Sequence, residues 1–147
     1  MLNDGPGFSP YIVEVVFVEA VARSIGDPHL GTKIGEFFDY SAYKRYASYV
    51  LGAPDLGSAI LRGQRAMPLI HPGSQIVLDR RNNHLIVGHN SDIQSGVGHR
   101  HLDEGATLVI SQVMKHVLGS DCRAEWTEIT GDRSSAHSTL PALVRIS

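Results

Sequence analysis

The chain has 147 residues, of which 42% are hydrophobic, and a formal net charge of −2. This is enough apolar sequence for one domain with its own core, and no segment has the composition of a disordered region. The slightly acidic balance argues against a stand-alone DNA-binding domain, which normally carries a basic face.

Cysteine usage and the N-terminal residues indicate the compartment. The single cysteine, Cys122, excludes an internal disulfide framework and fits a reducing cytosol. The first ten residues lack the basic start of a signal peptide. The apolar run from Tyr11 to Val18 is too short to span a bilayer and contains Glu14. The sequence therefore predicts a cytoplasmic protein without a membrane segment.

The first two predicted elements are helical. Residues 11–25 are rich in β-branched side chains, but their apolar positions recur at helical spacing and the run is longer than an ordinary strand. We expect a helix there that Gly26 and Pro28 end. Residues 29–39 are expected to form a short helix or a turn.

Two further helices are predicted from capping residues. Ser41 is expected to be the N-cap of a helix that ends at Gly52. Asp55 is expected to cap the next helix, and Pro68 should end it because proline lacks the backbone N–H.

The second half of the chain is predicted to contain a hairpin, a helix and a strand. Apolar and polar residues alternate over 75–79 and 84–89, with the turn at 80–83 between them. Residues 100–119 carry the clearest apolar stripe of a helix. Residues 122–130 are a further strand, and the tail after them carries little signal.

This order of elements predicts an α+β fold. Helices come first, and a hairpin, a helix and a strand follow, which favours an antiparallel sheet packed against several helices. We predict a single domain over residues 1–147. The sequence contains no G-x-S-x-G, G-x-x-x-x-G-K-[ST] or strand-linked G-x-G-x-x-G pattern, so an enzyme is not expected.

Three stretches carry a resemblance to a known family: "GDPHLG" at 26–31, "GEFFD" at 35–39 and "LGAPDLGSAILRGQRAMPLI" at 51–70. With the order of the later elements, roughly over residues 11–130, the chain resembles the ligand-sensing domain of AraC/XylS-type transcription regulators of the arabinose-binding kind. The resemblance implies an effector-binding domain, a homodimer, and DNA binding only through a separate helix-turn-helix domain that this chain lacks.

Two shorter motifs resemble those of PilZ-type cyclic di-GMP receptors, which carry R-x-x-x-R and then [DN]-x-S-x-x-G. "RGQR" at 62–65 is one residue short of the first motif. "DIQSGVG" at 92–98 contains S-x-x-G, with Asp92 one place too early for the second. The likeness implies cyclic di-GMP as the ligand.

The residue types fit the chemistry of that ligand. Two arginines on one helical face can bind phosphates or stack on guanines, and a carboxylate can accept from a guanine edge. A serine and glycine N–H groups can hold a phosphate, and an arginine at a helix start adds positive charge. We predict that the domain binds cyclic di-GMP as its ligand and uses no cofactor. Whether Arg80 and Arg81 belong to the same site is left open. The predicted site consists of Arg62, Arg65, Asp92, Ser95, Gly96, Gly98 and Arg100.

Two alternatives stay open. The first is a small metabolite such as a sugar, amino acid or organic acid, in a pocket lined by aromatic residues, although packing is the preferred explanation of the tyrosines. These residues are Tyr40, Tyr43, Tyr46, Tyr49 and Trp126. The second is a metal site, although no H-E-x-x-H or C-x-x-C pattern supports it. Its candidate ligands are His84, His89, His99 and His101.

Overall fold

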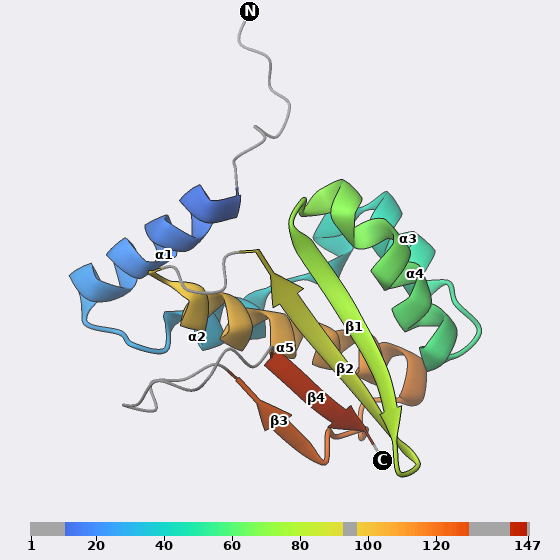
Figure 1. Ribbon diagram of the computed structural model, residues 1–147. Helices are drawn as coiled ribbons and strands as arrows, with labels where there is room; N and C mark the ends of the chain where they lie inside the picture. Colours follow the sequence, from blue (N-terminus) through green and yellow to red (C-terminus); the bar gives the residue numbers. More distant parts are fainter. Residues whose placement is uncertain (1–10, 93–96, 130–141, 147) are drawn as a thin grey trace, which may run out of the picture.

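The computed structural model describes residues 11–92, 97–129 and 142–146. Within these ranges, five α-helices and one short 3-10 helix pack with a four-stranded antiparallel sheet (Figure 1). This arrangement confirms the predicted α+β class. The elements in chain order are α1 (Tyr11–Ile25), α2 (Leu30–Phe37), the 3-10 helix η1 (Tyr40–Tyr43), α3 (Arg45–Leu51), α4 (Leu56–Ile70), β1 (Ser74–Arg81), β2 (His84–Ser91), α5 (His99–Leu118), β3 (Trp126–Glu128) and β4 (Ala142–Ile146).

The predicted hairpin is present, with a tighter turn than expected. β1 and β2 pair antiparallel from Ser74 opposite Ser91 to Arg81 opposite His84. Only Asn82 and Asn83 form the turn, with φ angles of 49° and 65°. Two successive positive φ angles match the twist of a two-residue hairpin, and asparagine tolerates that conformation better than most residues.

The sheet contains a strand that the sequence did not predict. The strand order is β1-β2-β4-β3, and β4 pairs antiparallel with both β2 and β3. Val144 of β4 lies opposite Val87 on one side and Thr127 on the other. The pairing partners of β4 are distant in sequence, so its local pattern carried little signal.

α4 begins as predicted but continues past its proline. The Asp55 carboxylate accepts a hydrogen bond from the Ser58 backbone N–H at 2.8 Å, which confirms the N-cap. The expectation that Pro68 ends the helix is wrong, because α4 extends to Ile70. Proline removes only its own N–H, and the last turn is closed by the His71 N–H, which donates to the Met67 carbonyl at 2.9 Å.

The helix predicted from Ser41 is split into two pieces. Lys44 has a φ of 49°, which interrupts the helical path between η1 and α3. The N-cap of η1 is Asp39, whose carboxylate accepts from the Ser41 N–H at 2.9 Å, so Ser41 is not the cap. The predicted end at Gly52 is confirmed.

The hydrophobic core consists of two clusters that share α5. The first cluster joins α4 and α5 to the inner face of the hairpin, and the second joins η1 and α3 to α4 and α5. In Figure 1, α5 runs behind the sheet, with α1 and α2 on one side and α3 and α4 on the other. The buried members are Leu56, Ile60, Ile76, Val87, Ile110 and Met114 in the first cluster, and Tyr40, Ala47, Val50, Ala59 and Val113 in the second.

Candidate functional site

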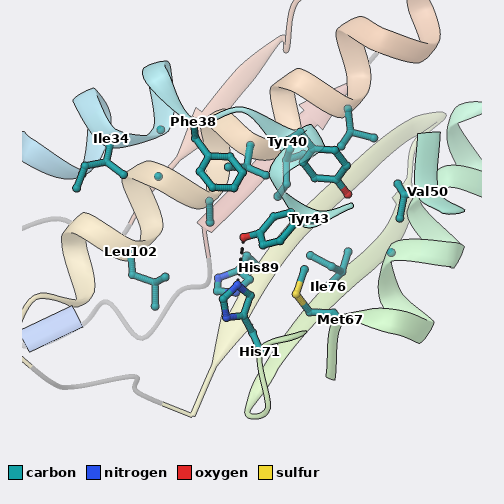
Figure 2. Close-up of a pocket in the computed structure, with 18 of the residues that line it drawn as sticks. Ile34, Phe38, Tyr40, Tyr43, Val50, Met67, His71, Ile76, His89 and Leu102 are labelled. Carbon is teal, nitrogen blue, oxygen red and sulfur yellow. Dashed lines mark hydrogen bonds between the residues drawn. The ribbon is translucent and has the colours of Figure 1, made fainter. Parts of the chain in front are cut away.

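A cavity of about 250 Å³ lies between the helices and the inner face of the hairpin. Residues of all five α-helices, of η1 and of both hairpin strands form its wall, so it lies where the two core clusters meet. The wall is mainly apolar, and Figure 2 shows Ile34, Phe38, Val50, Met67 and Leu102 around it. Such an apolar cavity within the core is typical of sites for small organic molecules.

Three polar side chains gather at one corner of this cavity. The Tyr43 hydroxyl of η1 lies 3.1 Å from Nε2 of His71, the residue directly after α4, and the two rings meet edge to face. His89 of β2 lies beside His71 in Figure 2. His89 is 5% exposed, and its Nδ1 is buried with no hydrogen-bond partner among the described residues.

These three groups are uncharged at neutral pH. Burial, with a smaller contribution from the neighbouring His71 and His99, lowers the pKa of His89 to about 4. Burial also lowers the pKa of His71, although Glu14 opposes this effect. Burial raises the pKa of Tyr43 to about 12. The corner therefore offers neutral hydrogen-bond donors and acceptors to a molecule in the cavity.

Three of the tyrosines both pack together and line the cavity. Tyr43 meets Tyr40 and Tyr46 nearly edge-on, with ring centroids 5.7 and 5.6 Å apart. These tyrosines therefore pack, as preferred from the sequence, and they also line the cavity. Tyr49 and Trp126 are not part of this wall.

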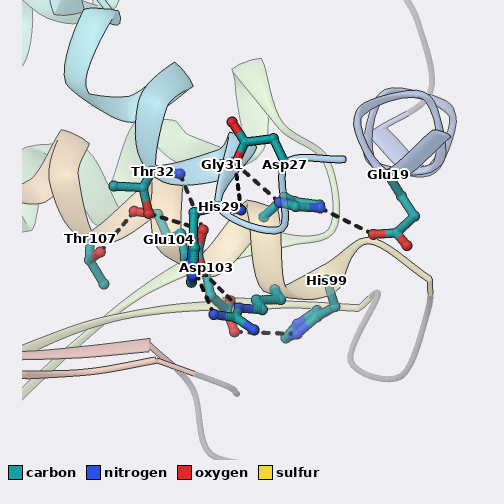
Figure 3. A network of polar contacts seen from close by, with 11 residues as sticks. Glu19, Asp27, His29, Gly31, Thr32, His99, Asp103, Glu104 and Thr107 are labelled. Atoms are coloured by element: carbon teal, nitrogen blue, oxygen red, sulfur yellow. Dashed lines mark hydrogen bonds and ion pairs between the residues drawn. The ribbon is translucent and has the colours of Figure 1, made fainter. Parts of the chain in front are cut away.

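A second polar region fastens α1 and α2 to α5 (Figure 3). The buried Glu104 carboxylate accepts from the backbone N–H and the hydroxyl of Thr32 at 3.2 and 3.0 Å, and from Arg100 Nε at 2.7 Å. His101 accepts from the Gly31 N–H at 3.2 Å and pairs with Glu19 of α1 at 3.1 Å. The "GDPHLG" stretch therefore serves the packing of α2 against α5.

The histidines proposed as metal ligands have separate places. His84 pairs with Glu125 at 3.3 Å, and His99 pairs with Asp103 at 3.3 Å. His101 contacts Gly31 and Glu19, and both His101 and His89 line the cavity. Across the part of the chain that the structure describes, no three histidine, cysteine or carboxylate side chains gather as metal ligands. The metal alternative thus has no support there.

The arginines of the predicted dinucleotide site lie in two places. Arg62 Nη1 donates to the Tyr49 carbonyl at 2.8 Å, and its guanidinium lies over the Tyr49 ring at 5.2 Å. Arg65 is exposed on the same helix, α4. Arg100, at the start of α5, contacts Glu104 and, through Nη2, His29 Nδ1 at 3.1 Å. In Figure 1, α4 and the start of α5 lie on opposite sides.

The remaining predicted ligand residues flank the loop between β2 and α5. Asp92 is exposed, and its N–H donates to the Gly73 carbonyl at 2.9 Å. Gly98 is the N-cap of α5, with a φ of 90°. Ser95 and Gly96 lie outside the described residues.

Arg80 and Arg81, the possible additions to the predicted site, lie elsewhere on the hairpin. Arg80 and Arg81 are at the end of β1 next to the turn, whereas Asp92 follows the opposite end of β2. The hairpin register therefore separates both arginines from Asp92 by the length of the strands. The cyclic di-GMP site stays a prediction, and none of its described residues lines the cavity.

Comparison with known families identifies the kind of domain. The family described as the arabinose-binding domain of AraC transcription regulators, N-terminal, matches residues 7–145. The chain belongs to this family. The match confirms the AraC-type resemblance and extends it to residue 145, within β4, whereas the PilZ-like likeness receives no support from it. No curated protein matches the chain at a significant level.

Family membership makes the chain a ligand-sensing regulatory domain. The description names arabinose, a sugar, and it places the domain at the N-terminal part of a transcription regulator. Among the described residues, no helix is long and apolar enough to cross a membrane.

Sequence reasoning missed the polar corner of the cavity. His89 lies between apolar and small residues on the inward face of β2, where an imidazole is unusual, and this inward polar position was the available signal. His71 follows a helix directly and looked like a loop residue. Its role depends on Tyr43, 28 residues earlier, so no local pattern indicated it.

Proposed function

We propose that this domain senses a small organic molecule that binds in the cavity of about 250 Å³ between the helices and the hairpin. The cavity carries the proposal, because it lies inside the core of a domain whose family is described as ligand-binding. Its mostly apolar wall with a few convergent polar groups is the usual composition of a ligand site.

A molecule in this cavity would contact several elements at once. Val15 and Val18 of α1, Ile34 of α2, and Val87 and His89 of β2 all face it. Ligand binding therefore favours the conformation in which α1, α2 and the hairpin close on the ligand. We propose that this shift in population changes how an attached DNA-binding domain engages its operator.

A pocket-filling variant tests the proposal. Ala106 of α5 lines the cavity, so Ala106→Leu places three additional carbon atoms in it. The matched control is Ala20→Leu on the exposed side of α1. Naphthalene, a purely apolar probe, should bind the native domain and Ala20→Leu with a dissociation constant below about 1 mM.

The variant comparison decides whether this cavity is the site. Ala106→Leu should weaken naphthalene binding at least tenfold, measured by the fluorescence of the probe, with unchanged far-ultraviolet circular dichroism. Equal binding to all three proteins would overturn the cavity as the ligand site.

Cyclic di-GMP is the second candidate effector. The observation in its favour is that the Arg62 guanidinium lies over the Tyr49 ring, next to the exposed Arg65 on the same helix. The contacts of Arg100 with Glu104 weigh against a site that includes all three arginines. Calorimetry with cyclic di-GMP, a cyclic di-AMP control and Arg65→Ala tests it. Binding that is specific for guanine and lost in the variant would favour this candidate.

We also propose a homodimer, because an operator with two half-sites matches the two-fold symmetry of a dimer. Light scattering on the domain and on the complete regulator, with and without ligand, tests this. A monomer under every condition would overturn it.

A further inference from the structure

Three polar side chains of the cavity meet at one corner. Tyr43, His71 and His89 come from η1, the end of α4 and β2, and they meet there (Figure 2). The described wall on α2 and α5 is apolar, with side chains such as Ile34 and Leu102, apart from His101, whose ring nitrogens contact Gly31 and Glu19. A ligand therefore meets one small polar region and a large apolar one.

His89 has unused hydrogen-bonding capacity at this corner. It is 5% exposed, and its Nδ1 has no partner among the described residues. The Ser74 hydroxyl also has no partner among the described residues, and the hairpin register places Ser74 on the same face of the sheet as His89, two residue pairs further along. Buried polar atoms are rarely left unpaired, so a ligand atom is the natural partner for the imidazole.

The charges around the cavity exclude an anionic ligand. The described lining residues include no arginine or lysine, and their one carboxylate is Glu14. The third lining histidine, His101, has both ring nitrogens engaged, by the Gly31 N–H and by the Glu19 carboxylate, so it is not available to pair with an anion. Burial keeps both His71 and His89 neutral at pH 7. A buried anion would lack a positive partner, which is strongly unfavourable.

A free sugar is also a poor fit to this wall. Each sugar hydroxyl loses its water on entering the cavity and needs a partner there. The polar corner can pair with one or two such groups, while the others would face apolar side chains such as Ile34, Phe38 and Leu102. The word arabinose in the family description therefore does not describe the ligand that this wall selects.

We infer that the cavity takes a neutral, mainly apolar molecule with a single hydrogen-bonding oxygen, a hydroxyl or a carbonyl, placed against His89. A dry cavity of about 150 Å³ binds benzene, so the present one has room for roughly ten non-hydrogen atoms. The inference rests on the proposed function and specifies the ligand class of the same site.

Three probes with the same ring system and different substituents distinguish an apolar, a hydroxylated and an anionic ligand. Naphthalene has no polar group, 2-naphthol adds a hydroxyl, and 2-naphthoate adds a carboxylate. The native domain should bind 2-naphthol at least tenfold more tightly than either of the others at pH 7, as measured by competition. His89→Phe should reduce the preference for 2-naphthol over naphthalene to less than threefold, while naphthalene affinity stays within threefold of the native value.

Two control variants keep this test independent of folding. His89→Gln retains a hydrogen-bonding group and should keep most of the preference for 2-naphthol. His84→Phe, on the same strand but paired with Glu125 outside the cavity wall, should leave the preference unchanged.

The outcomes distinguish this inference from the proposed function. If binding is lost in Ala106→Leu but naphthalene or 2-naphthoate binds as well as 2-naphthol, the cavity is the site and the inferred ligand class is wrong. If binding of every probe is the same in Ala106→Leu, the proposed function fails. If no probe binds the native domain, both are overturned.

Discussion

The Tyr43 hydroxyl lies 3.1 Å from His71 Nε2, and this contact joins η1 to the end of α4 across the polar corner of the cavity. The two residues are 28 positions apart, and they come from two different elements of the cavity wall. Both residues line the cavity, as does His89.

Removing this hydroxyl should weaken the fold slightly. Tyr43→Phe keeps the ring packing against Tyr40 and Tyr46 but loses the hydrogen bond to His71, so we expect a loss of about 1 kcal/mol in the free energy of unfolding. Urea denaturation measures it. The control, Tyr49→Phe at a position that is 42% exposed, should change stability by less than half as much. Equal effects would show that the contact with His71 contributes nothing.

The free energy of unfolding should decrease as the pH is lowered through the range in which histidine takes up a proton. The pKa of His89 is about 4 in the fold against 6.5 for an unperturbed histidine, so between these values the unfolded chain binds a proton that the folded chain does not. The free energy of unfolding therefore falls as the pH is lowered from 6.5 to 4. This residue should account for about 2 kcal/mol between pH 7 and pH 5.

His89→Phe separates this contribution from that of the other histidines. The variant should show a shallower loss between pH 7 and pH 5, while His71 and His99, whose pKa values burial also lowers, still contribute. Urea titrations at several pH values measure the slope. An unchanged slope in the variant would show that His89 titrates normally.

The approach of α2 to α5 requires a glycine at position 31. A Cβ atom on Gly31 would lie 2.2 Å from the His101 carbonyl oxygen, and neither backbone can move without disturbing the packing of the two helices. We expect Gly31→Ala to cost at least about 2 kcal/mol. Gly105→Ala, on the other side of the same interface, meets only ordinary contact at 3.5 Å and should be neutral or stabilising by up to about 1 kcal/mol. Thermal and urea unfolding of both variants distinguish these effects.

The Glu104 carboxylate should be important for docking α2. Glu104→Gln keeps the shape but removes the charge that Arg100 and Thr32 hydrogen-bond, so a loss of about 2 kcal/mol is expected at pH 7. These bonds lower the carboxyl pKa of Glu104 below 4.5 against the opposing effect of burial, so the stabilisation is present above pH 4.5 and lost as the pH falls further. Glu36→Gln, at an exposed position of α2, is the control. Hydrogen exchange at the amides of α2 should be faster in Glu104→Gln than in Glu36→Gln. Equal protection of these amides in the two variants would contradict this account.

The sequence predicted part of what depends on neighbouring residues. Asp55 caps α4 as predicted, and the hairpin turn lies within the predicted residues 80–83, at Asn82 and Asn83, because caps and short turns are determined within a few positions. The predicted cap at Ser41 was wrong, since Asp39 is the cap there. The family resemblance was also visible in short stretches, and its match over residues 7–145 confirms it.

Features that depend on distant contacts were not predicted. β4 needs β2 and β3 on either side, and Lys44 takes its positive φ between two helices that pack on different neighbours. The cavity likewise requires Tyr43, His71 and His89 to meet from three elements. The predicted dinucleotide site combined the PilZ-like motifs at 62–65 and 92–98 with Arg100, whereas the structure gives Arg62 and Arg100 different partners.

The central claim is that a mainly apolar ligand binds inside the core cavity. Its most direct test is an isotope-filtered nuclear Overhauser measurement on the complex with 2-naphthol. The account predicts contacts from the probe to the methyl groups of Val50, Val87 and Ile110, which line the cavity. Contacts only to the exposed methyl groups of Val13 and Val16 on α1, or no contacts to the domain, would contradict it.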